Sequence, residues 1–238
     1  TCYVVGKGVV DGIGKAINIL MPILFFLVIV LCIYSSLTGE FIKTLSFLFN
    51  PDFSKITPGV VITAMGQAFF SLSLGMGAIM TYGAYMSDDQ KILNTSITVG
   101  GLDTLVALMA GLAIFPIIFA SGLEVNSGGV GLVFITLSQT FETMFLGQIF
   151  GPLFFILLVI ASLSSSISLL EPSVAYFSEK NIISRKSAAF IFGFLAWFLG
   201  IGSVLSFNVL SDFYLLGDRT ILDSIVSVSY THLRAHET

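Results

Sequence analysis

Five long, nearly charge-free apolar runs constrain this chain more than any other feature. They cover residues 16–39, 56–87, 92–123, 143–170 and 187–211, and Asp103 is the one charged residue within them. Each run exceeds the ~20 mostly apolar residues that a helix needs to cross a bilayer. A core helix of a water-soluble protein would carry a polar face at 3.6-residue spacing, and these runs are apolar on nearly every face. We predict an all-α polytopic membrane protein with about five transmembrane helices.

The composition supports this prediction and excludes several classes of protein. Charged residues make up 10% of the chain, whereas soluble domains average roughly 25%. The mean hydropathy is +0.99 and the formal charge is −4, so no basic face is available for a nucleic acid. We therefore expect a lipid bilayer and no nucleic acid among the partners, and the expected location is the cell (inner) membrane.

The distribution of cations predicts the orientation of the spans. Alternating connections place six cations on one side, namely Lys7, Lys15, Lys91, Lys180, Arg185 and Lys186. The other side receives three, namely Lys43, Lys55 and Arg219. Cytoplasmic loops carry the excess of Lys and Arg, so the first side is expected to be cytoplasmic.

The two ends of the sequence suggest an incomplete protein. The chain begins with Thr1 rather than Met, and we expect an internal fragment. Its last residues, VSYTHLRAHET, are polar and contain both histidines, His232 and His236, at a helical metal-binding spacing. The string resembles translated sequencing-adapter sequence, so we expect residues 227–238 to be a non-native tail without function.

Asp103 is the first candidate functional residue, because it lies within an apolar run. A carboxylate at membrane depth costs several kcal/mol unless it meets a cation, a partner or water. No Lys or Arg of this chain lies at membrane depth, so a structural ion pair would need a partner from elsewhere. The residue pattern favours a role in an ion pathway and leaves the structural ion pair open.

Residues 66–77 form a second candidate. Gly75 and Gly77 flank Met76, and Ser71 and Ser73 precede them. Small residues can form a packing seam between helices. They can equally mark a discontinuous helix that unwinds near residues 73–75, where freed carbonyls bind a cation and the next half-helix faces a carboxylate. Composition does not decide between the two interpretations.

A row of serines at residues 161–168 is the third candidate. Five hydroxyls occur within seven residues of an apolar run, followed by Glu171 and Pro172. Serine can donate back to a carbonyl of its own helix. It can also offer oxygen ligands to sodium. For Glu171 we favour a gate or packing role near the inner interface.

Catalytic constellations are missing from the sequence, and we expect no enzyme and no organic cofactor. Both histidines lie in the tail, and no HExxH motif or Ser–His–Asp set can be assembled. Asp103 is a single intramembrane aspartate, whereas an aspartate protease of the membrane needs two. An intramembrane enzyme is therefore the weakest interpretation.

Four stretches resemble one transporter family. GQAFFSLSLGMGAIMTYGAY at residues 66–85 is similar to the sixth helix of the neurotransmitter:sodium symporter family, bacterial branch. PDFSKITPGV at 51–60, LDTLVALMAGLAIFP at 102–116 and ASLSSSISLLEP at 161–172 agree in order and spacing. The resemblance implies the inverted five-helix-repeat transporter fold, with the five runs as family helices five to nine. Residues 1–226 would then form a partial transporter domain, the end of the first repeat and most of the second.

The resemblance also implies the site residues. Those at substrate-contacting positions are Phe70, Ser71, Ser73 and Met76 on the sixth helix, and Ser166 and Leu169 on the eighth. Ser71 and Asp103 match ligands of the first sodium ion. The carbonyl of Ala161 and the hydroxyls of Ser164 and Ser165 match ligands of the second.

Gln67 matches a neighbour of the chloride site in chloride-dependent relatives. Asp103 would bring a fixed negative charge near that place, so the resemblance implies that chloride is not required.

The implied function is sodium-coupled symport of a neutral, hydrophobic or aromatic amino acid by alternating access. The family's first and third helices supply the other half of both sites, so this fragment is expected not to transport by itself. A homodimer of the full-length protein is compatible with the resemblance. The alternative function is a non-transporting scaffold or regulatory member of the same fold.

Overall fold

The computed structural model describes residues 1–122, 134, 137–206, 209–210, 220–221 and 224. None of these residues forms a strand. The chain divides into two compact units, which are described separately. The first unit comprises Thr1–Lys15, Ile56–Asp88 and Ser166–Thr238, and the second comprises Ala16–Lys55 and Asp89–Ser165. The predicted tail and both histidines lie outside the described residues.

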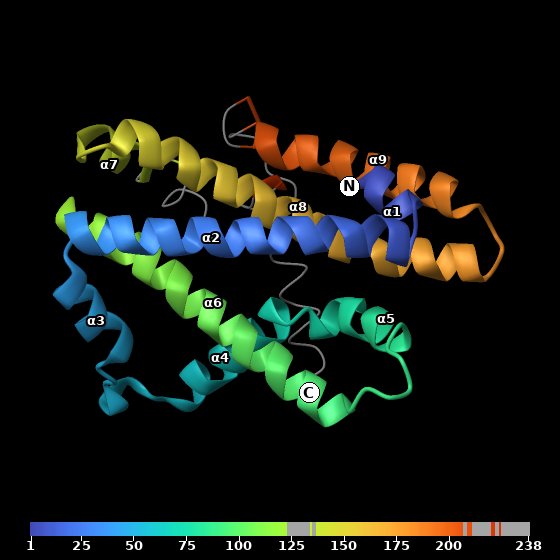
Figure 1. Cartoon of the computed structure of the whole chain (residues 1–238), viewed down its shortest axis with the longest axis horizontal. Helices are drawn as coiled ribbons and strands as arrows, with labels where there is room; N and C mark the ends of the chain where they lie inside the picture. The colour runs from blue at the N-terminus through green and yellow to red at the C-terminus, as the bar shows by residue number, and fades with distance from the viewer. Residues whose placement is uncertain (123–133, 135–136, 207–208, 211–219, 222–223, 225–238) are drawn as a thin grey trace. The chain divides into compact units, whose positions relative to one another are not determined.

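Four segments of the described chain are helical, long and apolar enough to cross a membrane (Figure 1). The first joins a π-helical segment η1 (Val9–Gly14) to α2 (Lys15–Thr38), and the others are α6 (Ile92–Ala120), α8 (Gly147–Glu179) and α9 (Arg185–Leu205). They match four of the five predicted runs, and α8 continues past Glu171 as expected. The prediction of a helical membrane protein is confirmed.

The remaining predicted run, residues 56–87, is helical but broken. It folds as α4 (Pro58–Ser71), a 3-10 turn η3 (Leu74–Met76) and α5 (Ala78–Ala84). Thr57 caps the start of α4, since its side chain accepts a hydrogen bond from the Val60 amide at 3.3 Å. The break follows from two left-handed residues, Ser73 with φ 55° and Gly77 with φ 76°. The structure therefore decides for a discontinuous helix, centred close to the predicted residues 73–75.

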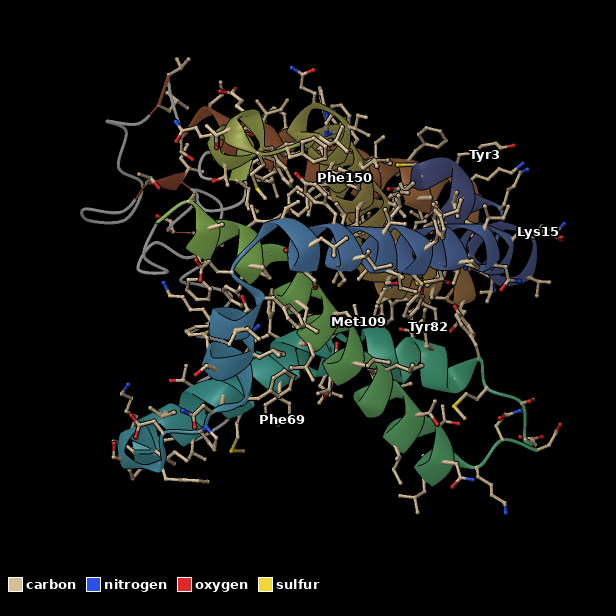
Figure 2. All side chains as sticks on the ribbon, turned by 60° about the vertical axis from the view of Figure 1, so that its left-hand side comes forward. Tyr3, Lys15, Phe69, Tyr82, Met109 and Phe150 are labelled. Carbon is tan, nitrogen blue, oxygen red and sulfur yellow. The ribbon has the colours of Figure 1, made fainter. Side chains whose placement is uncertain are left out.

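The second unit is built around an apolar core. Its buried residues come from α2, α6, α7 (Leu137–Thr143) and the first part of α8, and are Leu31, Tyr34, Ala113, Ile117, Ile118, Leu137, Phe141 and Phe154. Tyr34 stacks on Phe150, labelled in Figure 2, with ring centroids 3.8 Å apart. The Tyr34 hydroxyl donates to the Phe145 carbonyl at 2.7 Å. The one polar group of this aromatic pair is thereby satisfied inside the apolar environment.

A short helix that the sequence did not predict, α3 (Phe41–Phe49), packs along α6. The corner between α2 and α3 is fixed by the Glu40 amide, which donates to the Pro116 carbonyl at 3.0 Å. Gly39 is required at this corner, because a Cβ atom there would lie within 2.5 Å of that same carbonyl.

The first unit contains the short helix α1 (Cys2–Gly6), which packs closely on α9. Small residues permit this approach: a Cβ atom on Gly193 of α9 would collide with the Cys2 sulfur. The same unit contains the broken α4–η3–α5 segment and the second half of α8. These elements carry all six of the predicted substrate-contacting residues.

Candidate functional site

The break between α4 and α5 presents four predicted substrate residues. Phe70 and Ser71 are the last residues of α4, Ser73 adopts the left-handed conformation, and Met76 ends η3. Phe70 and Met76 are about two-fifths exposed, at 41% and 40%. A helix end leaves carbonyls without intrahelical partners, and a helix start leaves amides. The break therefore places potential cation ligands and potential anion ligands within seven residues of one another.

Ser166 and Leu169 lie together on α8 and line one cavity of about 290 Å³. Thr1, Cys2, Leu170, Gly193 and Ala196 complete its described lining. The Ser166 and Thr1 hydroxyls are 2.7 Å apart, so Ser166 is hydrogen-bonded to α1's N-terminal cap residue. None of the four residues at the break is among the described residues that line this cavity. The structure thus brings together the two predicted residues of α8, and their assignment to a substrate pocket stays a prediction.

The predicted ligands of the second sodium ion follow one another on α8. The Ser164 hydroxyl donates to the Ala161 carbonyl at 2.8 Å, so two of the three predicted oxygen ligands are adjacent. This bond is the local back-bond considered above as the structural alternative. It uses the hydroxyl proton and leaves lone pairs on both oxygens, which is compatible with a cation beside them. Ser165 lies next to them and is exposed.

The remaining predicted site residues are placed by their helices. Asp103 lies in the first half of α6 and is half-buried, and it belongs to the second unit. Ser71 and Gln67 lie on α4 in the first unit and are exposed. Each unit is described by itself, so the pairing of Ser71 with Asp103 stays a prediction, as does the role of Gln67.

A buried ion pair in the first unit was only partly anticipated. Glu171 of α8 is fully buried, and one terminal nitrogen of Arg185 donates to both of its carboxylate oxygens at 2.7 and 2.6 Å. The Arg185 Nε donates to the Val5 carbonyl of α1 at 3.0 Å, and the Tyr85 hydroxyl donates to Glu171 at 2.8 Å. Four segments of the first unit therefore meet around one ion pair.

This network, which we call the Glu171 cluster (Glu171, Arg185, Tyr85 and the Val5 carbonyl), compensates the burial of charge. A carboxylate removed from water is tolerated when a cation and further donors replace its hydration. Sequence reasoning assigned Glu171 to a gate or packing role and treated Arg185 as a loop cation. The signal was present: a glutamate inside an apolar helix and an arginine 14 residues later, across a tight inner turn.

A second contact joins the same elements. The Tyr82 hydroxyl of α5, labelled in Figure 2, donates to the Ser168 hydroxyl of α8 at 3.2 Å. Tyr82 and Tyr85 thus both direct hydroxyls to α8, one into the serine row and one to Glu171. Two polar contacts therefore join α5 and the residue after it to α8.

Comparison with protein-family profiles shows which family the chain belongs to. The profile of the Sodium:neurotransmitter symporter family matches residues 1–216. The chain belongs to this family. It is 36% identical over 223 residues to the uncharacterised sodium-dependent transporter YhdH of Bacillus subtilis, covering 94% of this chain and 49% of that protein. It is 30% identical to the uncharacterised sodium-dependent transporter MJ1319 of Methanocaldococcus jannaschii, with the same two coverages.

Solved structures of the family agree with the fold. The crystal structure of MhsT in complex with L-phenylalanine matches with a TM-score of 0.84 and 47% sequence identity. The match covers 98% of this chain and 53% of that one. The chain thus spans about half the length of each of these three relatives.

Proposed function

We propose that the protein containing this chain is a sodium-coupled symporter of a neutral, hydrophobic or aromatic amino acid. The observation that carries the proposal is the break between Ser71 and Ala78 in an otherwise apolar helix. Helix ends at the midplane of a membrane protein provide ligands for an ion and for a substrate carboxylate. Family membership supports coupling to sodium, and the likeness to a phenylalanine-bound relative supports the substrate class.

The proposed mechanism assigns a role to each predicted residue. Sodium ions bind at Ser71 with Asp103, and at the Ala161 carbonyl with Ser164 and Ser165. The substrate carboxylate meets one sodium ion and amides exposed at the break, near Ser73. The substrate side chain lies against Phe70 and Met76 on the sixth helix and against Ser166 and Leu169 on the eighth. The bundle then exposes the site to the cytoplasm.

Two further features belong to the proposal. The charge of Asp103 balances the bound sodium, so replacement of chloride by gluconate leaves transport unchanged. Gln67 occupies the position that lies beside the chloride site in chloride-dependent relatives, and it has no chloride to contact in this protein. The chain spans about half of its relatives, so it does not transport without the remaining helices. The full-length protein is expected in the cell membrane, with the Lys/Arg-rich loops in the cytoplasm.

Equilibrium binding tests the proposal. Labelled phenylalanine, leucine, tryptophan and tyrosine are bound to the purified full-length protein that contains this sequence, in sodium and then in potassium. We expect saturable binding of at least one of them that is lost in potassium. Binding that ignores the cation, or no binding of any neutral amino acid, contradicts the proposal and favours a non-transporting member of the family.

A further inference from the structure

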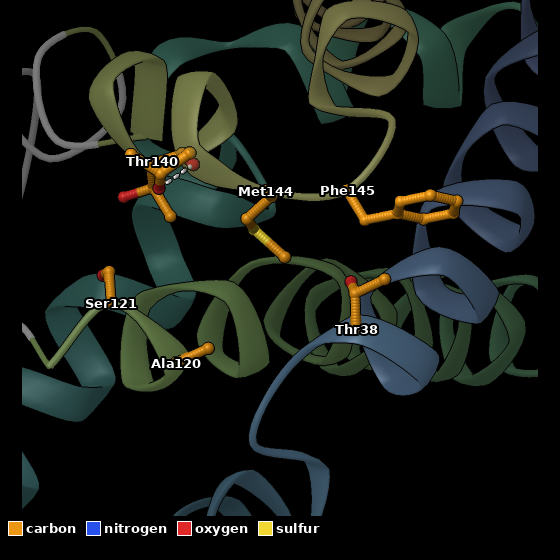
Figure 3. Close-up of a pocket in the computed structure, with 7 residues that line it drawn as sticks. Thr38, Ala120, Ser121, Thr140, Met144 and Phe145 are labelled. Atoms are coloured by element: carbon orange, nitrogen blue, oxygen red, sulfur yellow. Dashed lines mark hydrogen bonds between the residues drawn. The ribbon is translucent and has the colours of Figure 1, made fainter.

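A second cavity, in the second unit, belongs to no site described so far. It has a volume of about 350 Å³, within the range of small-molecule sites (Figure 3). Four hydroxyl residues line it, namely Thr38, Ser121, Thr140 and Thr143. Its described apolar lining consists of Ala120, Met144 and Phe145. We call it the hydroxyl cavity.

Three hydroxyls of the lining use their protons in local hydrogen bonds and keep their capacity to accept. Thr38 donates its hydroxyl proton to the Tyr34 carbonyl at 2.8 Å, and Ser121 donates to the Ile118 carbonyl at 2.7 Å. Thr143 donates to the Thr140 carbonyl at 2.9 Å, as the dashed line in Figure 3 shows. A hydroxyl that donates to its own helix retains lone pairs that can accept. Three of the four hydroxyls are therefore acceptors toward a ligand.

The ends of three helices place partial negative charge beside the hydroxyl cavity. The helix α2 ends at Thr38, α6 ends at Ala120 and α7 ends at Thr143, and all three terminal residues line the cavity. The C-terminus of a helix carries a partial negative charge, which is favourable for cations and unfavourable for anions. The long helices α2 and α6, of 24 and 29 residues, contribute most of this field.

The lining also defines the kind of cation. A divalent metal needs carboxylate, imidazole or thiolate ligands, and no group of three such residues occurs in the described part of the chain. The cavity is much larger than a bare monovalent ion. Met144 and Phe145 add a polarisable sulfur and an aromatic ring, which suit the apolar part and the charge of an organic amine.

We propose that the hydroxyl cavity binds a small organic ammonium ion that lacks a carboxylate. The ammonium group donates to the hydroxyl oxygens of Thr38, Ser121 and Thr143, where the three helix ends converge. Its apolar part lies against Met144 and Phe145. A zwitterionic amino acid is rejected, because its carboxylate would face the same acceptors and dipoles. The ligand class thus differs from that of the proposed transport site, which requires a carboxylate.

The probe is 2-phenylethylamine, which has the side chain of phenylalanine and no carboxylate. Its binding to the purified full-length protein that contains this sequence, in nanodiscs, is measured by equilibrium titration in potassium buffer without sodium. We expect saturable binding, and no competition by phenylalanine. The double variant Thr38→Val/Thr143→Val keeps the shape of the cavity and removes two acceptors, so we expect at least about tenfold weaker binding. Absence of saturable binding to the unmodified chain would mean a cavity that holds only water and would overturn the proposal.

Two further variants make the result specific. Thr98 lies at the other end of α6 and donates to the Asn94 carbonyl at 2.8 Å, so Thr98→Val removes the same chemistry away from the cavity and leaves binding unchanged. Ala120→Phe fills the cavity from an exposed position and abolishes binding. Should the double variant fail to fold, Ala120→Phe decides the question. Equal binding to Ala120→Phe and to the unmodified chain overturns the proposal.

Discussion

The first unit buries an ion pair where four segments meet, whereas the second unit buries aliphatic and aromatic side chains. In the first, the Glu171 cluster joins α1, α8, α9 and the residue after α5. In the second, Ile117, Phe141 and Phe154 belong to one continuous apolar core. Both arrangements lie among helices suited to a bilayer, whose acyl chains are as apolar as leucine. Apolar burial therefore gives little net drive to association there, and packing and hydrogen bonding decide stability.

This difference predicts which kind of substitution destabilises each unit most. A buried carboxylate stays favourable only while its cation and donors are present, so the first unit should respond to changes of charge. An apolar core gains from close contact of many atoms, so the second unit should respond to changes of volume. Four substitutions, from the largest expected effect to the smallest, test this distinction.

Arg185→Leu should have the largest effect. It leaves the Glu171 carboxylate buried without a cation, which costs about 3–5 kcal/mol in the free energy of unfolding. The double variant Glu171→Leu/Arg185→Leu removes both charges and should recover most of the loss. Unfolding in detergent, followed by circular dichroism, measures both. If the double variant is as unstable as Arg185→Leu, the charge-sensitive account of the first unit is wrong.

Ile117→Ala should have the next largest effect. Ile117 is 1% exposed, and its truncation leaves a cavity in the core of the second unit, at a cost of about 2–4 kcal/mol. The control is Ile97→Ala on the same helix, where the side chain is 66% exposed. The same unfolding measurement should show almost no change for Ile97→Ala. Equal losses at the two positions would contradict the volume-sensitive account.

Gly77→Ala tests the break in the first unit. Gly77 has φ 76°, a conformation that costs a residue with a Cβ atom about 1–2 kcal/mol. The new Cβ would lie 3.9 Å from Pro172, an ordinary contact, so strain is the expected cause. Gly66→Ala, inside α4 with open space around the site, should instead stabilise by about 0.5–1 kcal/mol through helix propensity. Stabilisation by both alanines would show that the helix is continuous at residue 77.

Asp52→Asn should have the smallest effect. A hydrogen bond from the Ser54 side chain, followed by one from Lys55, lowers the pKa of the exposed Asp52 carboxyl. A lowered native pKa means stability that is present above the ordinary carboxyl pKa and is lost as the pH falls through the native value. The variant should therefore melt slightly below the unmodified chain at pH 7, and at the same temperature below about pH 3. A difference that persists in acid would exclude the carboxylate as its source.

Much of the fold could be predicted from the sequence, because the transmembrane signal is strong and local. The helices α2 (Lys15–Thr38) and α6 (Ile92–Ala120) begin and end within about three residues of the predicted runs. The helix α8 (Gly147–Glu179) extends beyond its predicted run, and α9 (Arg185–Leu205) ends before the end of its predicted run. The discontinuity was predicted from Gly75, Gly77 and the serines before them, although composition left a packing seam equally open. Backbone dihedral angles at Ser73 and Gly77 were needed to decide.

The parts that could not be predicted depend on tertiary contacts. The short helix α3 lacks the length of a span and is held by packing on α6. Arg185 was counted only as an inner-loop cation, because its spacing of 14 residues from Glu171 suggests a pair but does not establish that the side chain turns toward the carboxylate. The hydroxyl cavity forms where three helix ends converge, and hydroxyl residues spread over 106 positions, from Thr38 to Thr143, carry no recognisable spacing.

The central claim is that sodium and a neutral amino acid bind together, with Asp103 among the sodium ligands. It is tested most directly by a sodium titration of phenylalanine binding to the full-length protein that contains this sequence. Asp103→Asn should require at least about tenfold more sodium for half-maximal binding, because it removes the fixed charge at the ion site. The control Asp88→Asn, at an exposed position, should titrate like the unmodified protein. Identical sodium dependence of Asp103→Asn and the unmodified protein would contradict the account.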